Sequence, residues 1–276
     1  MGPTRAPTAV SQIDTLRREL HARGRVVVAF SGGADSAFLA WMATDALGPD
    51  RALCVTAVSP SLAPEERADC EALAGEWGLR WTALETDELA NAAYSANDGS
   101  RCYHCKAELM AVLGPVAAAE GAVVALGVNL DDLGDHRPGQ DAARQGGAVF
   151  PLVEAGFTKA DVRAASRLLG LRTWDKPAAA CLASRVPYGT AVTLGVLESV
   201  ARAESALRRL GFGQLRVRHY GDLARIELDS AELSRAVECR DAIVTAVRQA
   251  GYAYVTLDLE GFRSGNLNRS LGSGRS

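Results

Sequence analysis

The chain lacks the long apolar runs that would place it in a membrane. Nowhere in its 276 residues does an apolar run approach the roughly 20 residues that a membrane-spanning helix needs. The first ten residues, MGPTRAPTAV, also lack the apolar stretch of a secretory signal peptide. We therefore expect a cytoplasmic protein with no membrane partner.

Positive charge is not in excess either. Lys and Arg total 30 against 33 Asp and Glu, for a net charge of -3. A general nucleic-acid binder usually carries a basic face and a high pI, so we expect no nucleic-acid partner. With 48% hydrophobic and 23% charged residues, the composition is globular, and the length suggests two domains of unequal size.

Apolar runs alternate with helix-like periodicity over the first two-thirds of the chain. The predicted strands span residues 25–30, 53–58, 79–84 and 122–127. Helices are predicted at residues 36–47 and 106–120, and another follows Pro60 and Pro64 and ends near Gly78. This alternation predicts an α/β fold with a doubly wound parallel sheet. An Asp-, Gly- and Arg-rich stretch at 129–147 is predicted as a long loop, and a capping box of Thr158 and Asp161 predicts a helix that ends near Gly170.

The pattern of predicted helices and strands changes after residue 190. Helices are predicted at residues 194–210 and 231–249, and strands at 215–219, 224–228 and 252–257, which together predict a smaller α+β domain for substrate binding or oligomerisation. We place the domain boundaries as follows: residues 1–20 are a flexible segment and the start of the first helix, 21–188 the large domain, 189–268 the small domain, and 269–276 a loose tail.

A glycine turn follows the first predicted strand at Ser31, Gly32, Gly33, Ala34, Asp35 and Ser36. Between a strand and a helix, the backbone N–H groups of such a turn and the positive end of the helix can hold a pyrophosphate. Asp35 is a candidate for orienting Mg²⁺, and Ser31 and Ser36 add hydroxyl donors. No lysine completes an ordinary P-loop, and a tight turn with a serine cap is the structural alternative.

The six cysteines are unevenly spaced and argue for thiols or metal ligation rather than a disulfide framework. Cys54, Cys70 and Cys239 lie in predicted strands or helices without chemically suggestive neighbours, so we expect them to be packing residues. The other three are candidate ligands.

Cys102 and Cys105 form a CxxC at the start of a predicted helix, and Cys181 lies beside Arg185 in a Pro-bounded segment at the domain junction. Three cysteines suit a [4Fe-4S] cluster whose fourth iron has no protein thiolate. The sequence leaves open a structural zinc, a redox dithiol, or thiols without a ligand role.

Several charged residues are candidates for ligand contacts. Arg216 and Arg218 alternate along a predicted strand and so share one face, where they could bind a phosphate; a solvated strand face is the alternative. Asp131 and Asp132 follow the strand at 122–127 and could bind metal or ribose, or cap a turn.

The motif SGGADS, placed after the first strand, resembles the PP-loop of the ATP pyrophosphatases, which include NAD synthetases, asparagine synthetases and tRNA-thiolating enzymes. The resemblance covers roughly the first two-thirds of the chain. It implies cleavage of ATP to AMP and pyrophosphate, but it does not specify the acceptor.

Other segments are similar to one branch of that superfamily, the LarE-type sulfur transferases. They are residues 127–139, 175–190, 216–219 and 261–265. The family makes the pyridinium bis-thiocarboxylate mononucleotide that becomes the nickel-pincer cofactor of lactate racemase. The resemblance implies catalytic roles for Asp35, Cys181, Ser184 and Arg185. It also implies ligand-binding roles for Gly127, Asp131, Glu204, Arg216 and Arg218, although Glu204 also forms an i,i+4 pair with Arg208 that predicts an exposed ion pair.

One version of the family sacrifices the sulfur of a single cysteine, and another uses three cysteines that bind an iron-sulfur cluster. Cys102, Cys105 and Cys181 place this chain with the second version. The expected cofactors are therefore ATP, Mg²⁺ and a [4Fe-4S] cluster, and we expect a homo-oligomer; the sequence does not identify the sulfide donor. A tRNA-thiolating enzyme and a non-catalytic nucleotide- or metal-binding regulator are the alternatives.

Overall fold

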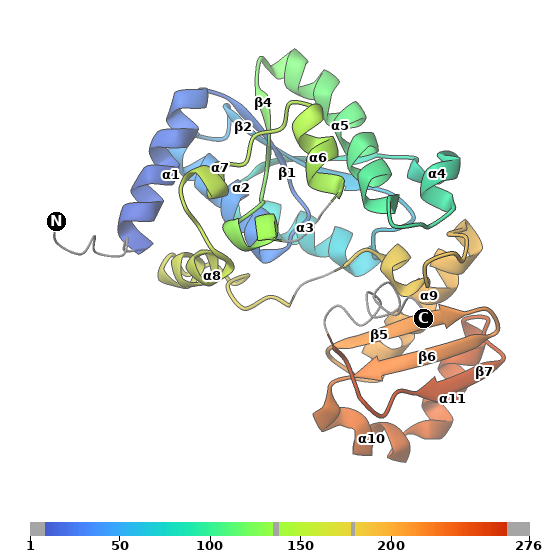
Figure 1. Ribbon diagram of the computed structural model, residues 1–276. Coiled ribbons are helices and arrows are strands. Elements are labelled where there is room, and N and C mark those ends of the chain that lie inside the picture. Colours follow the sequence, from blue (N-terminus) through green and yellow to red (C-terminus); the bar gives the residue numbers. More distant parts are fainter. Residues whose placement is uncertain (1–8, 135–137, 178–179, 264–276) are drawn as a thin grey trace. The chain divides into compact units, whose positions relative to one another are not determined.

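The computed structural model describes residues 9–134, 138–177 and 180–263. The predicted tail at 269–276, residues 1–8 and 264–268, and motif residues 135–137 lie outside the described residues. Two compact units make up the chain (Figure 1). The first comprises Met1–Ser59, Pro64–Glu88 and Cys102–Ala179, and the second Pro60–Ala63, Leu89–Arg101 and Ala180–Ser276.

The first unit is built on a parallel sheet of four strands in the order β3-β2-β1-β4. The strands are β1 (Val26–Ala29), β2 (Ala52–Val58), β3 (Arg80–Glu85) and β4 (Val123–Leu126). Each lies within the range predicted from the sequence or extends it by one residue. The sheet confirms the predicted doubly wound α/β fold.

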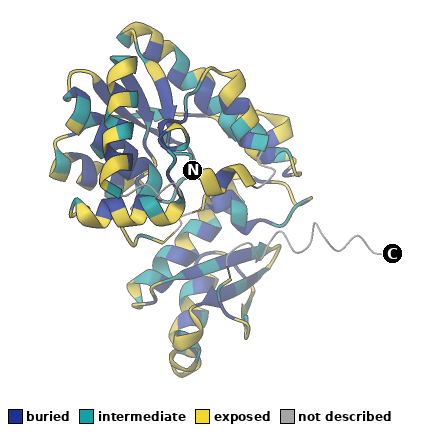
Figure 2. Ribbon diagram, turned by 60° about the vertical axis from the view of Figure 1, so that its left-hand side comes forward, coloured by how far each residue is buried: buried dark blue, intermediate teal, exposed yellow. Residues whose placement is uncertain are grey.

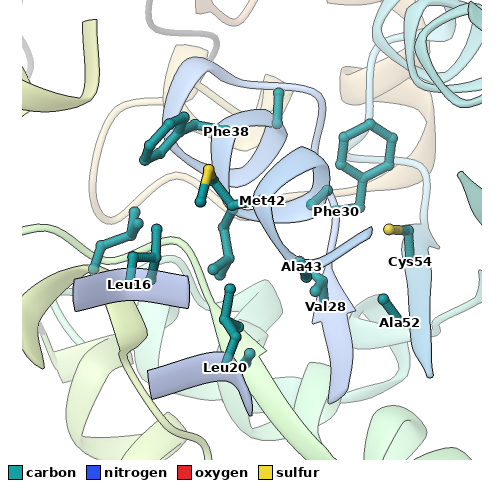
Figure 3. Packing of buried hydrophobic residues seen from close by; sticks show 14 of the residues in the cluster. Leu16, Leu20, Val28, Phe30, Phe38, Met42, Ala43, Ala52 and Cys54 are labelled. Atoms are coloured by element: carbon teal, nitrogen blue, oxygen red, sulfur yellow. The ribbon is translucent and has the colours of Figure 1, made fainter. Parts of the chain in front are cut away.

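Helices cover both faces of this sheet because its strands are apolar on both sides. Val26 and Val28 pack in one hydrophobic cluster, and Val27 between them packs in another. The first cluster contains residues of α1 (Ala9–Arg23), α2 (Ala34–Leu47), α3 (Pro64–Trp77) and α8 (Lys159–Leu168). Figure 3 shows Val28 beside Ala43 in this cluster, with Leu20 below them.

The opposite face is covered by α5 (Arg101–Glu120) and α6 (Pro138–Gln145). The short elements of this part of the chain are η1 (Glu88–Ala90), α4 (Ala92–Ser95), η2 (Leu130–Gly134) and α7 (Pro151–Glu154). The capping box of Thr158 and Asp161 is formed at the start of α8, as predicted. None of the helices in the described ranges is both long and apolar enough to cross a bilayer.

The second unit contains a three-stranded sheet in the order β5-β6-β7. β5 (Leu215–Tyr220) and β6 (Leu223–Leu228) are antiparallel, whereas β6 and β7 (Tyr254–Leu257) are parallel. One face packs on α9 (Leu194–Arg209), α10 (Leu233–Glu238) and α11 (Arg240–Gln249). In Figure 2 the central strands of the first unit, β1 and β2, are largely dark blue, whereas the outer sides of the helices are yellow. The remaining 3₁₀ elements are η3 (Leu182–Arg185) and η4 (Ser230–Glu232).

Two sequence predictions are corrected. The stretch predicted as a loop at 129–147 contains η2 and α6, because Ala142 and Ala143 give α6 a buried face too small to register as hydrophobic periodicity. The helix predicted at 231–249 is divided into η4, α10 and α11, since Cys239 leaves helical geometry with φ -90° and ψ 12°.

Candidate active site

The predicted nucleotide loop connects β1 to α2 in the first unit. Gly32 adopts a left-handed conformation with φ +68°, and a Cβ at this position would lie 2.9 Å from Cys70 Sγ. Only glycine satisfies both conditions without strain. The Ser36 hydroxyl closes the turn by accepting from the Ser31 N–H (3.2 Å) and donating to the Gly33 carbonyl (3.2 Å).

The loop leaves the start of α2 suited to an anion. Gly33 is the N-cap residue and provides no side-chain cap. The first N–H groups of a helix have no acceptor within the helix, and here no N-cap side-chain oxygen competes with an anion for them. The geometry therefore suits the outer phosphates of a nucleotide.

The segment after β4 meets this loop at the point where the strand order reverses. β4 and β1 are parallel neighbours, so the loops that follow them leave the same edge of the sheet, where ligands of open α/β sheets bind. Gly127 lies in close contact with α2, because a Cβ there would be 2.8 Å from both the Cα and N atoms of Ser36. Gly127 thus permits the close approach of the two segments.

Asp35 lies half-buried in the first turn of α2. Its carboxylate accepts a hydrogen bond from Asn129 Nδ2 (3.1 Å), and Asn129 N donates to Asp132 Oδ2 (3.3 Å). Burial, and secondarily the charge of Asp132, raise the pKa of Asp35 despite the bond from Asn129. Two neighbouring carboxylates in such a site fit a divalent cation such as Mg²⁺, for which oxygen ligands are preferred.

Asp131 and Asp132 differ in their surroundings. Asp131 is exposed, and its carboxylate accepts from the backbone N–H of Lys159 at the start of α8 (2.7 Å). Asp131 therefore caps the first turn of α8. Asp132 is buried, and its Oδ1 lies 3.4 Å from Lys159 Nζ. Of the two carboxylates, Asp132 is therefore the one connected to Asp35 through Asn129.

Lys176 contacts the nucleotide loop, and no role was predicted for it from the sequence. Its ammonium group donates to the carbonyl of Gly32 (3.1 Å) and bonds to Glu66 and Asp69 on α3 (2.8 and 2.7 Å). These partners are more than 100 residues away along the chain, so no local pattern in the sequence indicates the contact.

In the second unit, Cys181 occupies the N-cap position of η3, and its thiol is exposed. The turn closes through a bond from the Ser184 N–H to the Cys181 carbonyl (2.9 Å), and the Leu182 N–H donates to Ser61 (2.8 Å). The predicted cysteine is thus presented at the start of a turn that is fixed by backbone hydrogen bonds.

Three arginine side chains donate hydrogen bonds to the backbone of this turn. They bind four backbone carbonyls: Arg185 donates to Ala180 (2.7 Å) and Cys181 (3.1 Å), Arg101 to Ala183 (2.9 Å), and Arg218 to Ser184 (2.8 Å). Arg185 also donates to the Ser184 hydroxyl (3.0 Å). Two predicted catalytic residues, Ser184 and Arg185, therefore lie within the framework that orients Cys181.

The prediction that Glu204 forms an exposed ion pair is wrong in one respect. The pair with Arg208 exists (3.2 Å), but Glu204 is 0% exposed. Its carboxylate receives two bonds from Arg185 (2.8 and 3.0 Å) and one from the Val217 N–H (3.0 Å). Burial would raise the pKa of Glu204, but the hydrogen bonds and charge of Arg185, the Val217 N–H and the charge of Arg208 together outweigh burial and lower it.

Arg216 and Arg218 point to the face of β5 opposite the buried Val217. Arg218 is buried and pairs with Glu227 (2.9 Å), so the alternative of a solvated strand face is wrong for Arg218. Arg216 is half-buried, with its guanidinium 5.0 Å from the centre of the Phe262 ring. Burial, followed by the charge of Arg185, lowers the pKa of Arg216 to about 10, so Arg216 remains cationic at neutral pH.

The cysteines divide between the units. Cys102 and Cys105 lie at the start of α5 in the first unit, and Cys181 belongs to the second. Cys102 and Cys181 are exposed and Cys105 is half-buried. Across the ranges that the structure describes, no group of three or more His, Cys, Asp or Glu side chains is gathered as a metal site. The three-cysteine ligand set therefore stays a prediction.

The remaining cysteines are packing residues. Cys54 and Cys70 are buried in the core, as predicted, and burial raises the pKa of the Cys54 thiol to about 12. Cys239 is half-buried and packs against the core of the second unit.

The chain is similar in sequence to several known proteins. A family described as NAD synthase matches residues 9–111, which include the loop after β1. An uncharacterized protein of Synechocystis is 47% identical over 264 residues, covering 95% of this chain and 98% of the relative. Another, from Methanocaldococcus jannaschii, is 25% identical over 241 residues, covering 87% and 91%.

A relative with a named activity matches the chain along almost its whole length. The pyridinium-3,5-bisthiocarboxylic acid mononucleotide synthase of Lactiplantibacillus plantarum is 39% identical over 265 residues, covering 96% of each chain. The family resemblance inferred from the sequence is thereby confirmed. This chain belongs to the LarE-type family of ATP-dependent sulfur transferases, within the PP-loop ATP pyrophosphatases.

Proposed function

We propose that the chain uses ATP to adenylate a carboxylate of pyridinium-3,5-biscarboxylic acid mononucleotide and converts this carboxylate to a thiocarboxylate. The observation that carries the proposal is the 39% identity to the mononucleotide synthase over 96% of both chains. The product would be a precursor of the nickel-pincer cofactor of lactate racemase. We further propose a cytoplasmic homo-oligomer.

Adenylation takes place at the loop between β1 and α2. A substrate carboxylate oxygen attacks the α-phosphorus of ATP, the bond to the β-phosphate oxygen breaks, and pyrophosphate leaves. The backbone N–H groups at the start of α2 stabilise the outer phosphates, and Asp35 and Asp132 would hold the Mg²⁺ that offsets their charge. A carboxylate is a poor electrophile, so this step is needed before sulfur can enter.

The phosphate of the mononucleotide is bound at the arginines of the second unit. Among the described residues, this network contains five guanidinium groups and three carboxylates: Arg185, Arg208, Arg216, Arg218 and Arg225 pair with Glu204, Glu227 and Asp258 or lie beside these pairs. Nε of Arg218 is buried and has no hydrogen-bond partner among the described residues. This unsatisfied donor, in a cluster of arginines, supports binding of an anion.

Sulfur transfer takes place at Cys181. Sulfide presented there as HS⁻ attacks the acyl carbon of the adenylate and gives up its proton, the bond to the AMP oxygen breaks, and AMP leaves with that bond's electron pair, so that the product is a thiocarboxylate. The three arginines that hold the turn keep Cys181 in place, which supports a defined angle of attack.

The thiols of Cys102, Cys105 and Cys181 fit the donor chemistry of an iron-sulfur cluster, since Fe–S clusters are held by cysteine thiolates. A [4Fe-4S] cluster on Cys102, Cys105 and Cys181 would supply an open iron that can carry sulfide.

Two assays test the proposal. Incubation with ATP, Mg²⁺ and the biscarboxylate mononucleotide should release pyrophosphate only when the mononucleotide is present. Pyrophosphate release that ignores the mononucleotide but requires tRNA would instead indicate a tRNA-thiolating enzyme, and no release would indicate a regulator. Anaerobically purified protein should contain iron and sulfide that Cys102→Ala loses, whereas one zinc per chain without iron would contradict the cluster.

A further inference from the structure

Lys176 is tied to the nucleotide loop by an arrangement that the proposed chemistry does not use. Its side chain is 17% exposed, and the ammonium group has three oxygen partners within 3.1 Å: the Gly32 carbonyl, Glu66 and Asp69. An ammonium group has three N–H donors, so these partners use its full capacity. Lys176 is therefore held in place by α3 and in turn holds one carbonyl of the loop.

That bond fixes the direction of a peptide group in the loop. No cis peptide occurs among the described residues, and in a trans peptide the C=O and N–H bonds point in opposite directions. Because the Gly32 carbonyl faces Lys176, the Gly33 N–H faces away from Lys176. A reversal of this peptide would turn a partly negative oxygen to the side now occupied by the N–H, where it would repel a phosphate.

The charge of Lys176 is already offset. Burial alone would lower the pKa of Lys176, but its bonds to Asp69 and Glu66 outweigh burial and raise the pKa, so the group stays protonated. Two carboxylates beside one ammonium group leave no net positive charge for ATP. Lys176 is thus suited to orienting the loop rather than to binding a phosphate itself.

We propose that Lys176 is a positioning residue for ATP: by holding the Gly32 carbonyl, it keeps the Gly33 N–H directed at the outer phosphates. This inference rests on the proposed function only in that the loop binds ATP. The affected interaction is one that ATP makes through its β- and γ-phosphates. AMP lacks these phosphates and should be insensitive to the orientation of this peptide.

The test compares Lys176→Met with Arg172→Met in the full chain. Arg172 is a matched control because it also bonds to Asp69 (2.7 Å), and its other bond goes to Glu76 (2.7 Å). Among the described residues, Lys176 bonds to the loop and Arg172 does not. Calorimetric titration with ATP, pyrophosphate and AMP in the presence of Mg²⁺ gives the dissociation constants, and urea unfolding gives the stability of each variant.

Lys176→Met should weaken ATP and pyrophosphate binding about 10- to 100-fold, the size expected for a charge-assisted hydrogen bond, and leave AMP binding within about 3-fold. Arg172→Met should leave all three ligands within about 3-fold of the wild type. Equal weakening of ATP and AMP, or unchanged ATP binding, would overturn the positioning role.

If Lys176→Met does not fold, Lys176→Gln carries the test, because it keeps a polar side chain but is too short and uncharged to replace the ammonium group. A reduced preference for ATP over AMP supports the proposal, and the wild-type preference overturns it. Failure of the wild-type chain itself to bind ATP would instead refute the proposed function, so the two failures are distinguishable.

Discussion

The guanidinium of Arg218 donates to the backbone carbonyl of Ser184 across 2.8 Å, which joins strand β5 to the turn that carries Cys181. The same side chain pairs with the fully buried Glu227. The residue expected to bind substrate phosphate is therefore also a support of the sulfur-bearing turn, and an anion bound at β5 would contact a side chain that holds this turn.

Arg218→Met should slow sulfur transfer more than its effect on stability explains. Removal of the side chain leaves the Ser184 carbonyl without this donor and Glu227 with Arg225, at a cost of about 2–4 kcal/mol in the free energy of unfolding. Arg225→Met is the matched comparison, because it also removes one cation of the network and one partner of Glu227 but leaves the bond to Ser184 in place. Equal thiocarboxylate formation by the two variants would show that the bond to Ser184 has no part in transfer.

Glu204→Gln should destabilise the second unit by about 3–5 kcal/mol near neutral pH, because it removes the buried charge opposite Arg185 and Arg208. The folded pKa of Glu204 is lowered, so its contribution is fully present above the ordinary pKa of about 4.3 and is lost as the pH falls toward the folded pKa. Urea unfolding between acidic and neutral pH measures the difference. A difference independent of pH would contradict the ion-pair explanation.

Asp35→Asn should lower the rate of pyrophosphate release by about 10²- to 10³-fold while stabilising the ligand-free protein at neutral pH. Burial raises the pKa of Asp35, so the ionised carboxylate opposes folding at pH values above the folded pKa, and the amide removes this cost. Thermal unfolding without Mg²⁺ and a pyrophosphate assay with Mg²⁺ provide the two readouts. Lower stability of the ligand-free variant would contradict the assigned cause.

Gly127→Ala should disturb the nucleotide loop. The added Cβ would lie 2.8 Å from backbone atoms of Ser36, so α2 or β4 must shift, at a cost of about 1–3 kcal/mol and with weaker ATP binding. Gly75→Ala is the matched control, since it lies within α3 with open space around it and should stabilise the chain by up to about 1 kcal/mol. Similar ATP dissociation constants for both variants would count against a role of Gly127 in the loop.

The parallel sheet could be predicted from the sequence because its strands are apolar on both faces, as Val26–Val28 illustrate. Burial of Glu204 also had a signal. Glu204 lies seven residues after Leu197 and three before Leu207, on the buried face of α9. This position indicated a buried carboxylate, and it was a stronger signal than the i,i+4 spacing to Arg208, which indicated an exposed ion pair.

Other features had no local signal. The bond between Asn129 and Asp35 joins residues 94 positions apart, and the bond between Lys176 and Gly32 joins residues 144 positions apart. Helical or strand periodicity relates residues that are close in the sequence. It could therefore place these residues at the ends of helices and strands, but it could not predict the hydrogen bonds between them. The arginines around Cys181 were hidden for the same reason, because Arg101 and Arg218 reach the turn from distant segments.

The central claim is that ATP cleavage at the loop after β1 and sulfur delivery at Cys181 are separate steps of one reaction. It is tested most directly by measuring pyrophosphate and thiocarboxylate together in Cys181→Ala and in the wild type. The variant should release pyrophosphate at a rate within about threefold of the wild type when the mononucleotide is present, but form no thiocarboxylate. Thiocarboxylate formation by the variant at the wild-type level would contradict the account.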